Sequence, residues 1–149
     1  LDEVIAERPS ALVLSGDITM NGEKINHQEL AQRLKRVQDA GIQVLIIPGN
    51  HDINNRNAAS FDGRSRQMAE AVSANEFAEI YNDFGYDEAL SRDPASLSYT
   101  YDLGPDMRLL MLDSCQYSPT NKVGGMIKTE TYDWIDDQLD EAWNTVKNW

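Results

Sequence analysis

Short apolar runs alternate along this chain with stretches of helical periodicity. Residues 11–15 and 44–47 are apolar runs of strand length, and each run ends near a glycine. Between them, Leu30, Leu34 and Val37 recur at the spacing of one helix face. Parallel strands require a crossover of this kind. The pattern therefore predicts two buried parallel strands joined by a helix.

Helix ends are marked by capping residues and glycines. Asn26 followed by Glu29 resembles a capping box that opens the crossover helix, and Gly41 is placed to end it. Ser73 followed by Glu76 is a second capping box, ahead of an apolar stripe at helical spacing. We expect both helices to pack on the sheet.

The rest of the chain predicts one more helix at each end, a long loop and a hairpin. Residues 1–7 have the pattern of a helix, and residues 53–66 are polar with the composition of a loop. Residues 97–102 alternate as in a half-buried strand, and residues 108–113 return as an apolar strand. From residue 132 onward a helical apolar face consists of Ile135, Leu139, Ala142, Trp143 and Val146. The expected fold class is α/β, with a parallel βαβ unit followed by helices and a hairpin.

Composition narrows the classes of function. The 149 residues, 41% hydrophobic and 26% charged, are those of an ordinary globular domain, and we expect residues 1–149 to form one. A formal charge of −12 argues against a surface for nucleic acid or anionic membrane, since both need clustered cations. Most of the acidic excess suits a solvated surface, with a share around a metal site as the alternative. No apolar run reaches the roughly 18 residues of a membrane span.

Two motifs follow the two predicted strands. Gly16-Asp17 follows the first, and Gly49-Asn50-His51-Asp52 follows the second. The carboxyl ends of neighbouring parallel strands meet at one edge of a sheet, about 4.8 Å apart, and chemistry collects at that edge. We therefore expect Asp17 and Asn50 to emerge side by side.

At these residues the sequence resembles the calcineurin-like metallophosphoesterases, which carry a Gly-Asp after one strand and a Gly-Asn-His-Asp or Gly-Asn-His-Glu after the next. The resemblance implies a partial αββα sandwich and two divalent metal ions, Mn, Fe or Zn. It implies that Asp17 bridges the two ions and that Asn50 ligates one of them and touches the phosphate. It places His51 near the leaving or attacking oxygen, with Asp52 orienting it. The implied reaction is hydrolysis of a small phosphoester, either a phosphodiester or a nucleotide-type phosphomonoester.

The sequence departs from that family pattern at its histidines. The family also carries an Asp-x-His upstream and a Gly-His and a Gly-His-x-His downstream, whereas this chain has only His27 and His51. We therefore expect the chain to be the central portion of a larger catalytic domain, with an incomplete metal site and no activity alone. His27, in the first turn of the predicted crossover helix, is expected to face solvent, with metal ligation as the alternative.

Other polar residues are candidates for supporting parts. Arg56, Arg64 and Arg66 lie on the predicted loop after the second motif and are candidates for holding a phosphate or a second anionic group, or for solvating the loop. Asp113 is expected to anchor the loop that follows it, with metal binding as the alternative. Cys115 is expected to be a packing residue, and as the single cysteine it excludes an internal disulfide.

Two other functions remain open at this stage. One is a non-catalytic scaffold or interaction module with the same fold, and the other is a generic α/β binding domain. The motif region also resembles exported bacterial members of the family, which implies an extracytoplasmic location. The sequence leaves the oligomeric state, the native metal and the substrate open.

Overall fold

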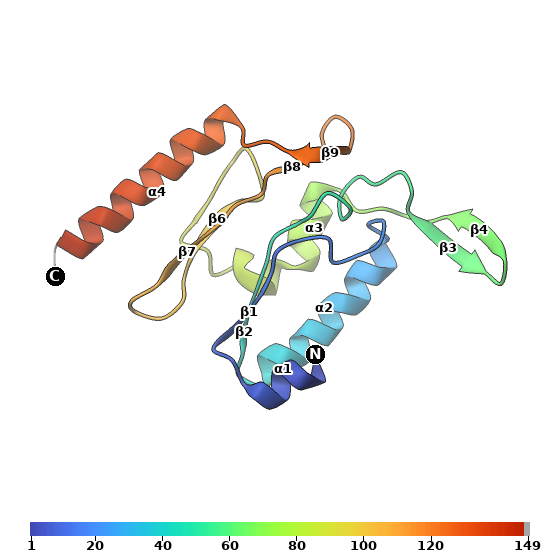
Figure 1. The fold of residues 1–149 in the computed structure, drawn as a ribbon, viewed down its shortest axis with the longest axis horizontal. Helices are drawn as coiled ribbons and strands as arrows, with labels where there is room; N and C mark the ends of the chain where they lie inside the picture. Colours follow the sequence, from blue (N-terminus) through green and yellow to red (C-terminus); the bar gives the residue numbers. More distant parts are fainter. Residues whose placement is uncertain (148–149) are drawn as a thin grey trace.

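The computed structural model describes residues 1–147, with side chains through residue 145. Figure 1 shows α4 at one side of the strands and α2 at the other. The elements in chain order are α1 (Asp2–Glu7), β1 (Ala11–Leu14), α2 (Lys24–Asp39), β2 (Gln43–Ile46), β3 (Ala59–Asp62), β4 (Ser65–Met68), α3 (Ala74–Ile80), a π-helical turn (Asn82–Tyr86), β5 (Ser91–Arg92), β6 (Tyr99–Asp102), β7 (Arg108–Met111), β8 (Cys115–Gln116), β9 (Lys122–Gly125) and α4 (Thr129–Lys147).

The predicted βαβ unit is present. Strands β1 and β2 pair in parallel, with Leu14 opposite Ile46, and α2 forms the crossover between them. Val44, Leu45 and Ile46 are completely buried, which explains the uninterrupted apolar run. The expected α/β class is therefore confirmed.

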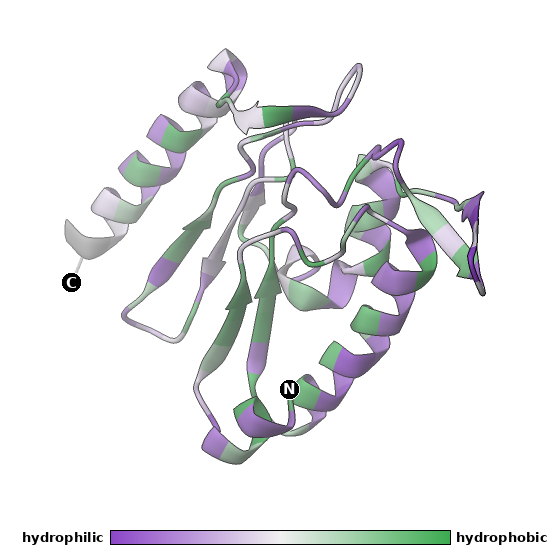
Figure 2. Ribbon diagram, turned by 45° about the vertical axis from the view of Figure 1, so that its right-hand side comes forward, coloured by the Kyte–Doolittle hydropathy of each residue, from purple (hydrophilic) through white to green (hydrophobic). Residues whose placement is uncertain are grey.

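A second sheet, ordered β5-β6-β7, lies next to the first without a backbone ladder to it. The link is a side chain, because the buried hydroxyl of Tyr99 donates to the carbonyl of Ile46 at 2.9 Å and accepts from its N–H at 3.1 Å. Tyr99 thus satisfies the backbone of the last residue of β2 where a neighbouring strand would otherwise do so. Figure 2 shows the mostly apolar β1 and β2 between α2 and the second sheet.

The hairpin of β6 and β7 is confirmed, but β6 is not half-buried as predicted. Tyr99, Thr100 and Tyr101 are all buried, although their side chains alternate between two faces. The reason is that α4 covers the second face, where Gln138 contacts Thr100 at 3.2 Å. A strand covered on both faces need not alternate in polarity.

The packed face of helix α4 matches the predicted one only in part. Its buried residues are Thr131, Trp134 and Gln138, and the predicted Ile135 and Ala142 are half-buried. In contrast, Leu139 is 56% exposed and Trp143 is 61% exposed. Polar partners on β5 and directly after it determine this rotation of the helix. The indole of Trp134 donates to Ser91 on β5 at 2.9 Å, and the hydroxyl of Thr131 donates to Asp93 at 2.6 Å. The predicted position Val146 lies outside the described side chains.

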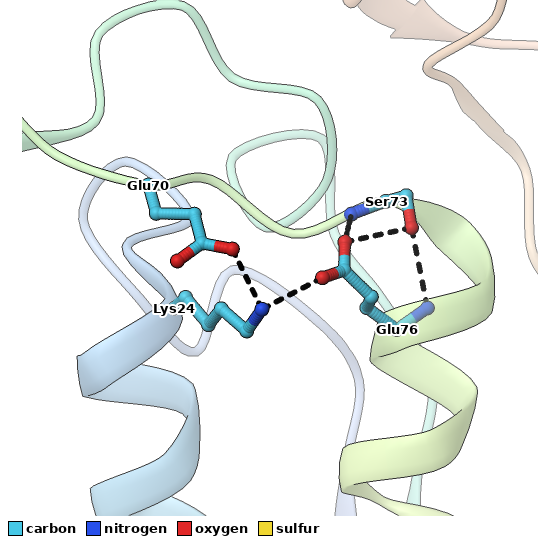
Figure 3. Close-up of polar contacts among 4 residues, drawn as sticks. All are labelled: Lys24, Glu70, Ser73 and Glu76. Atoms are coloured by element: carbon cyan, nitrogen blue, oxygen red, sulfur yellow. Dashed lines mark hydrogen bonds and ion pairs between the residues drawn. The ribbon is translucent and has the colours of Figure 1, made fainter.

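Helix α2 begins earlier than predicted, and its start is tied to α3. Its N-cap is Glu23 and no side chain caps it, so the capping box expected at Asn26 is wrong. The capping box of Ser73 and Glu76 is confirmed (Figure 3). The ammonium of Lys24 lies 2.6 Å from the Glu70 carboxylate and 2.8 Å from that of Glu76, which joins the N-terminal ends of the two helices.

The predicted loop of residues 53–66 is partly a hairpin. Strands β3 and β4 pair antiparallel around a turn at Gly63, and Figure 1 shows this hairpin projecting away from the rest of the molecule. Its side chains are almost all exposed, so hydrophobic patterning carried no sign of it. Across residues 1–147, no helix is both long enough and apolar enough to cross a membrane.

Candidate active site

Two loops meet where β1 and β2 end. Gly16 has a positive φ of 97°, and a Cβ built on it would lie 2.5 Å from the backbone nitrogen of Gly49. A Cβ on Gly49 would in turn overlap the backbone nitrogen and carboxylate of Asp17. Only glycine at both positions lets the two loops approach so closely. The two sequence motifs therefore touch through their glycines.

Asp17 lies directly against the second motif. Its backbone is left-handed, with φ of 50°, which is uncommon for a residue other than glycine and is typical of strain at functional sites. Its Oδ1 accepts the backbone N–H of His51 at 2.9 Å. Its carboxylate thus sits at the peptide that joins Asn50 to His51. The predicted meeting of the two motifs is confirmed, and the metal-ligand roles of Asp17 and Asn50 stay predictions.

His51 is held by the first loop. The imidazole is exposed, and its Nδ1 lies 2.6 Å from the carbonyl oxygen of Met20. A carbonyl can only accept, so Nδ1 must carry the proton and the ring's other nitrogen, Nε2, is the one that gains or loses a proton. The carbonyl of Met20 therefore fixes both the tautomer and the orientation of the ring.

Asp52 was predicted to orient the His51 ring, but its carboxylate makes other contacts. Its carboxylate is buried and accepts from the backbone N–H groups of Gly49 at 2.8 Å, Thr19 at 3.0 Å and Ile18 at 3.3 Å. It also accepts from the hydroxyl of Thr19 at 2.9 Å. A buried carboxylate needs several such donors. Asp52 therefore joins the two loops, and the predicted orienting contact is made by Met20 instead.

His27 is completely buried, so the expectation that it faces solvent is wrong. Its Nε2 lies 3.0 Å from the carbonyl oxygen of Asp52, and its Nδ1 lies 2.8 Å from the hydroxyl of Tyr81. Burial lowers the pKa of His27, against opposing effects of Asp52 and Glu23. A neutral ring that donates from Nε2 to Asp52 and accepts at Nδ1 fits both contacts. His27 thus supports the second motif from behind.

The arginines predicted to hold an anion lie on the hairpin of β3 and β4 or on the segment before it. Arg64 lies in the turn at the tip of the projecting β3-β4 hairpin (Figure 1), and Arg66 on β4 donates to the carbonyl of Asn57 at 3.0 Å. Arg56 is exposed on the segment that leads to the hairpin. Within residues 1–147 no hydrogen bond or ion pair joins Arg56 or Arg64 to Asp17 or Asn50. Their substrate role stays a prediction without geometric support.

The end of β7 adds an anchored loop beside the site. Asp113 is buried and accepts from the backbone N–H groups of Cys115 at 2.9 Å and Leu97 at 3.1 Å, which confirms the expected anchoring role. Cys115 is half-buried, with its Sγ 3.4 Å from the carbonyl oxygen of Pro48. Burial and the nearby carboxylates raise the pKa of its thiol to about 12, so it is protonated at neutral pH and suits packing rather than nucleophilic attack.

Sequence patterning missed the segment that follows Cys115. The side-chain amide of Asn121 donates to the carbonyl oxygens of Asn50 at 2.5 Å and Ile53 at 2.7 Å. A cavity of about 190 Å³ lies next to this segment. Its lining residues are Cys115, Gln116, Tyr117, Ser118, Lys122, Met126 and Lys128. Neither feature belongs to a motif, so no sequence signal pointed to it.

The donor set fits part of a divalent metal site. Asp17 and Asn50 lie in the two adjoining loops and carry a carboxylate and an amide oxygen, and oxygen ligands of this kind suit a hard divalent ion such as Mn²⁺. Among residues 1–147 no cluster of three or more histidine, cysteine, aspartate or glutamate side chains has the geometry to hold a metal. Asp17 and Asn50 therefore stay predicted ligands, and within the described residues they would not complete such a site by themselves.

Comparison with known proteins gives two matches. The sequence model of the calcineurin-like phosphoesterase family matches residues 1–148. This stretch includes both loops and every site residue described above. A probable cyclic nucleotide phosphodiesterase of Ruthia magnifica subsp. Calyptogena magnifica is 42% identical over 55 residues. That alignment covers 37% of this chain and only 22% of the relative's length.

Proposed function

Because the chain belongs to the calcineurin-like phosphoesterase family, we propose that the protein containing it hydrolyses a phosphodiester with the aid of two divalent metal ions. One observation carries most weight: the Asp17 carboxylate accepts the N–H of His51 at 2.9 Å, so the acid and the Gly-Asn-His-Asp loop form one polar edge. The relative named as a probable cyclic nucleotide phosphodiesterase supports a diester substrate.

Asp17 and Asn50 are the residues that would hold metal. Bound divalent ions lower the pKa of a coordinated water from about 15.7 towards 7 and polarise the phosphoryl oxygens. Asp17 has a second carboxylate oxygen beyond the one that binds His51, and Asn50 adds an oxygen without adding negative charge. Because these two side chains do not complete a coordination sphere, we propose that residues 1–149 alone are inactive.

His51 is the proposed proton donor. With its Nδ1 proton fixed on the carbonyl of Met20 at 2.6 Å, the imidazolium form can release only the proton on Nε2. Transfer of that proton to the leaving alkoxide is general acid catalysis, for which histidine is the side chain most often used. Asp52 contributes indirectly, because its carboxylate keeps the loop of His51 against the loop of Met20.

The test is hydrolysis of bis(p-nitrophenyl) phosphate with Mn²⁺ by the full-length protein. We expect turnover by the wild type and a loss of about 10²- to 10³-fold in kcat for His51→Ala. Asp62→Asn, an exposed acid on the β3-β4 hairpin, serves as the control and keeps wild-type turnover. A wild-type protein that is inert with Mn²⁺, Fe²⁺, Zn²⁺ and Mg²⁺ would refute the proposal.

Two further measurements test the substrate class and the metal site. The kcat/KM for a cyclic nucleotide, which is a diester, is compared with that for p-nitrophenyl phosphate, which is a monoester. We expect the larger kcat/KM for the diester. Calorimetric titration with Mn²⁺ tests the proposal that residues 1–149 do not complete the metal site. Tight binding of two ions per chain would contradict that proposal.

A further inference from the structure

One peptide unit at the site is held from both ends. It is the unit that contains the carbonyl of Asn50 and the N–H of His51. The carbonyl accepts from the side-chain amide of Asn121 at 2.5 Å, and the N–H donates to the carboxylate of Asp17 at 2.9 Å. Because a peptide unit is planar, fixing both groups fixes the rotation of the whole plane.

That rotation determines where the site side chains lie. Turning the plane changes ψ of Asn50 and φ of His51, so it moves the proposed ligand and the proposed acid together. Asp17 secures the plane from the side of β1. Asn121 secures it from the opposite end, from a segment 71 positions further along the chain.

Asn121 is itself well anchored. Its segment is tied back to the loop after the second motif by the side chain of Asn54, which donates to the carbonyl of Tyr117 at 2.9 Å. Tyr117 in turn donates its hydroxyl to the buried Asp113 at 2.7 Å. Asparagine side chains thus join the loop that follows β2 and the connection between β8 and β9 in both directions, and Asn121 is not a freely rotating surface residue.

The chemistry of this position requires an amide. The NH₂ group has two hydrogens, and it has two carbonyl acceptors, those of Asn50 and Ile53. A carboxylate of the same shape has no hydrogen to donate and would repel both carbonyls. An aspartate at position 121 therefore removes both contacts and keeps the volume.

We propose that Asn121 is a positioning residue of the active site, which sets the peptide plane between Asn50 and His51. Its effect on turnover rests on the function proposed above. Its effect on the backbone does not, since it follows from the hydrogen bonds alone.

The test compares Asn121→Asp with Asn57→Ala, a substitution of an exposed asparagine in the loop after the second motif. Amide hydrogen exchange of the His51 N–H is measured by NMR in the 149-residue chain. We expect exchange about tenfold faster in Asn121→Asp, with β6 and β7 amides unchanged and the Asn57→Ala control like wild type. Equal exchange of the His51 amide in both variants would overturn the proposal, and so would a uniform acceleration across β6 and β7.

Activity supplies the second readout. In the full-length protein we expect Asn121→Asp to lower kcat for bis(p-nitrophenyl) phosphate about tenfold or more with KM little changed, because misplaced groups slow the chemical step. A variant with wild-type kcat overturns the positioning role. An inert wild type refutes the proposed function instead, and the exchange result then decides the backbone role by itself.

Discussion

The carboxylate of Asp52 accepts the hydroxyl of Thr19 at 2.9 Å, across 33 positions of sequence. The same carboxylate also accepts the backbone N–H of Thr19 at 3.0 Å and that of Gly49 at 2.8 Å. One buried acid therefore joins the loop after β1 to the loop after β2. The two loops of the proposed site form a single unit because of this residue.

Replacing Asp52 should loosen that unit. In Asp52→Asn, one carboxylate oxygen becomes an NH₂ group that faces backbone N–H donors, so at least one donor is left buried without an acceptor. We expect the free energy of unfolding to fall by about 3 kcal/mol, because buried N–H groups lose their bonds to a carboxylate acceptor. Urea denaturation followed by circular dichroism measures it.

The matched control is Asp62→Asn on the exposed β3-β4 hairpin. This substitution makes the same chemical change where water satisfies either side chain, so we expect a change within about 0.5 kcal/mol. Equal stability of the two variants would show that the buried carboxylate does not hold the loops together.

The contact between Gly16 and Gly49 makes a second prediction. Gly16→Ala should destabilise the protein, because its Cβ would meet the backbone nitrogen of Gly49 at 2.5 Å. Gly104→Ala is the matched control, since Gly104 also has a positive φ, of 75°, but has open space around it. We expect Gly16→Ala to be less stable than the control by about 2 kcal/mol in thermal unfolding. Similar melting temperatures would mean that the two loops can separate freely.

The sequence was sufficient for the parts of the site that are set by local chemistry. Uninterrupted apolar runs predicted β1 and β2, and the glycines after them predicted where the chain turns. Parallel pairing then required the ends to meet, and the contact of Asp17 with His51 confirms it. These inferences succeeded because each depended on neighbouring residues and on one rule of sheet topology.

The parts that failed depend on contacts between distant residues. Burial of His27 follows from Tyr81 and Asp52, which are 54 and 25 positions away. The rotation of α4 follows from polar partners on β5 and β6, so the apolar periodicity located only part of the buried face. A polar residue that is satisfied by a distant partner looks like a surface residue in the sequence.

The capping box of α3 offers a direct measurement (Figure 3). The hydroxyl of Ser73 accepts the N–H of Glu76, and the Glu76 carboxylate accepts the N–H of Ser73 at 2.9 Å. We expect Ser73→Ala to cost about 1 kcal/mol in urea denaturation, because the first turn of α3 loses its cap. Ser60→Ala, on the exposed β3, should cost much less. A Ser73→Ala protein as stable as Ser60→Ala would contradict the role of the cap.

The ion pair of Glu76 predicts that folding stability depends on pH in the acid range. Its contact with Lys24, helped by the Ser73 backbone, lowers the pKa of Glu76 to about 2 from 4.5. A carboxyl with a lowered pKa in the folded state stabilises the fold above pH 4.5, and that stability is lost as the pH falls towards about 2. The stability difference between wild type and Glu76→Gln should therefore shrink over this window. A difference that stays constant with pH would show that the ion pair contributes nothing.

The buried His27 predicts that folding stability also depends on pH in a range nearer to neutral. Burial lowers its pKa below the ordinary value of 6.5, and it remains neutral between Tyr81 and the carbonyl of Asp52. Below pH 6.5 the unfolded chain takes up a proton at this residue that the folded chain does not, so stability falls with the pH in that window and is fully present above it. His27→Gln keeps an amide donor for Asp52 but cannot titrate.

The measurement is urea denaturation of wild type, His27→Gln and Gln28→Ala at about pH 5.0 and pH 7.5. The advantage of wild type over His27→Gln should be larger at the higher pH, because the cost of the lowered pKa is absent there. Gln28 is exposed next to His27 and does not titrate, so the effect of Gln28→Ala should be the same at both pH values. An advantage that grows as the pH falls would mean that the protonated ring is the form that supports the loop of Asp52, and the neutral tautomer assigned to His27 would be wrong.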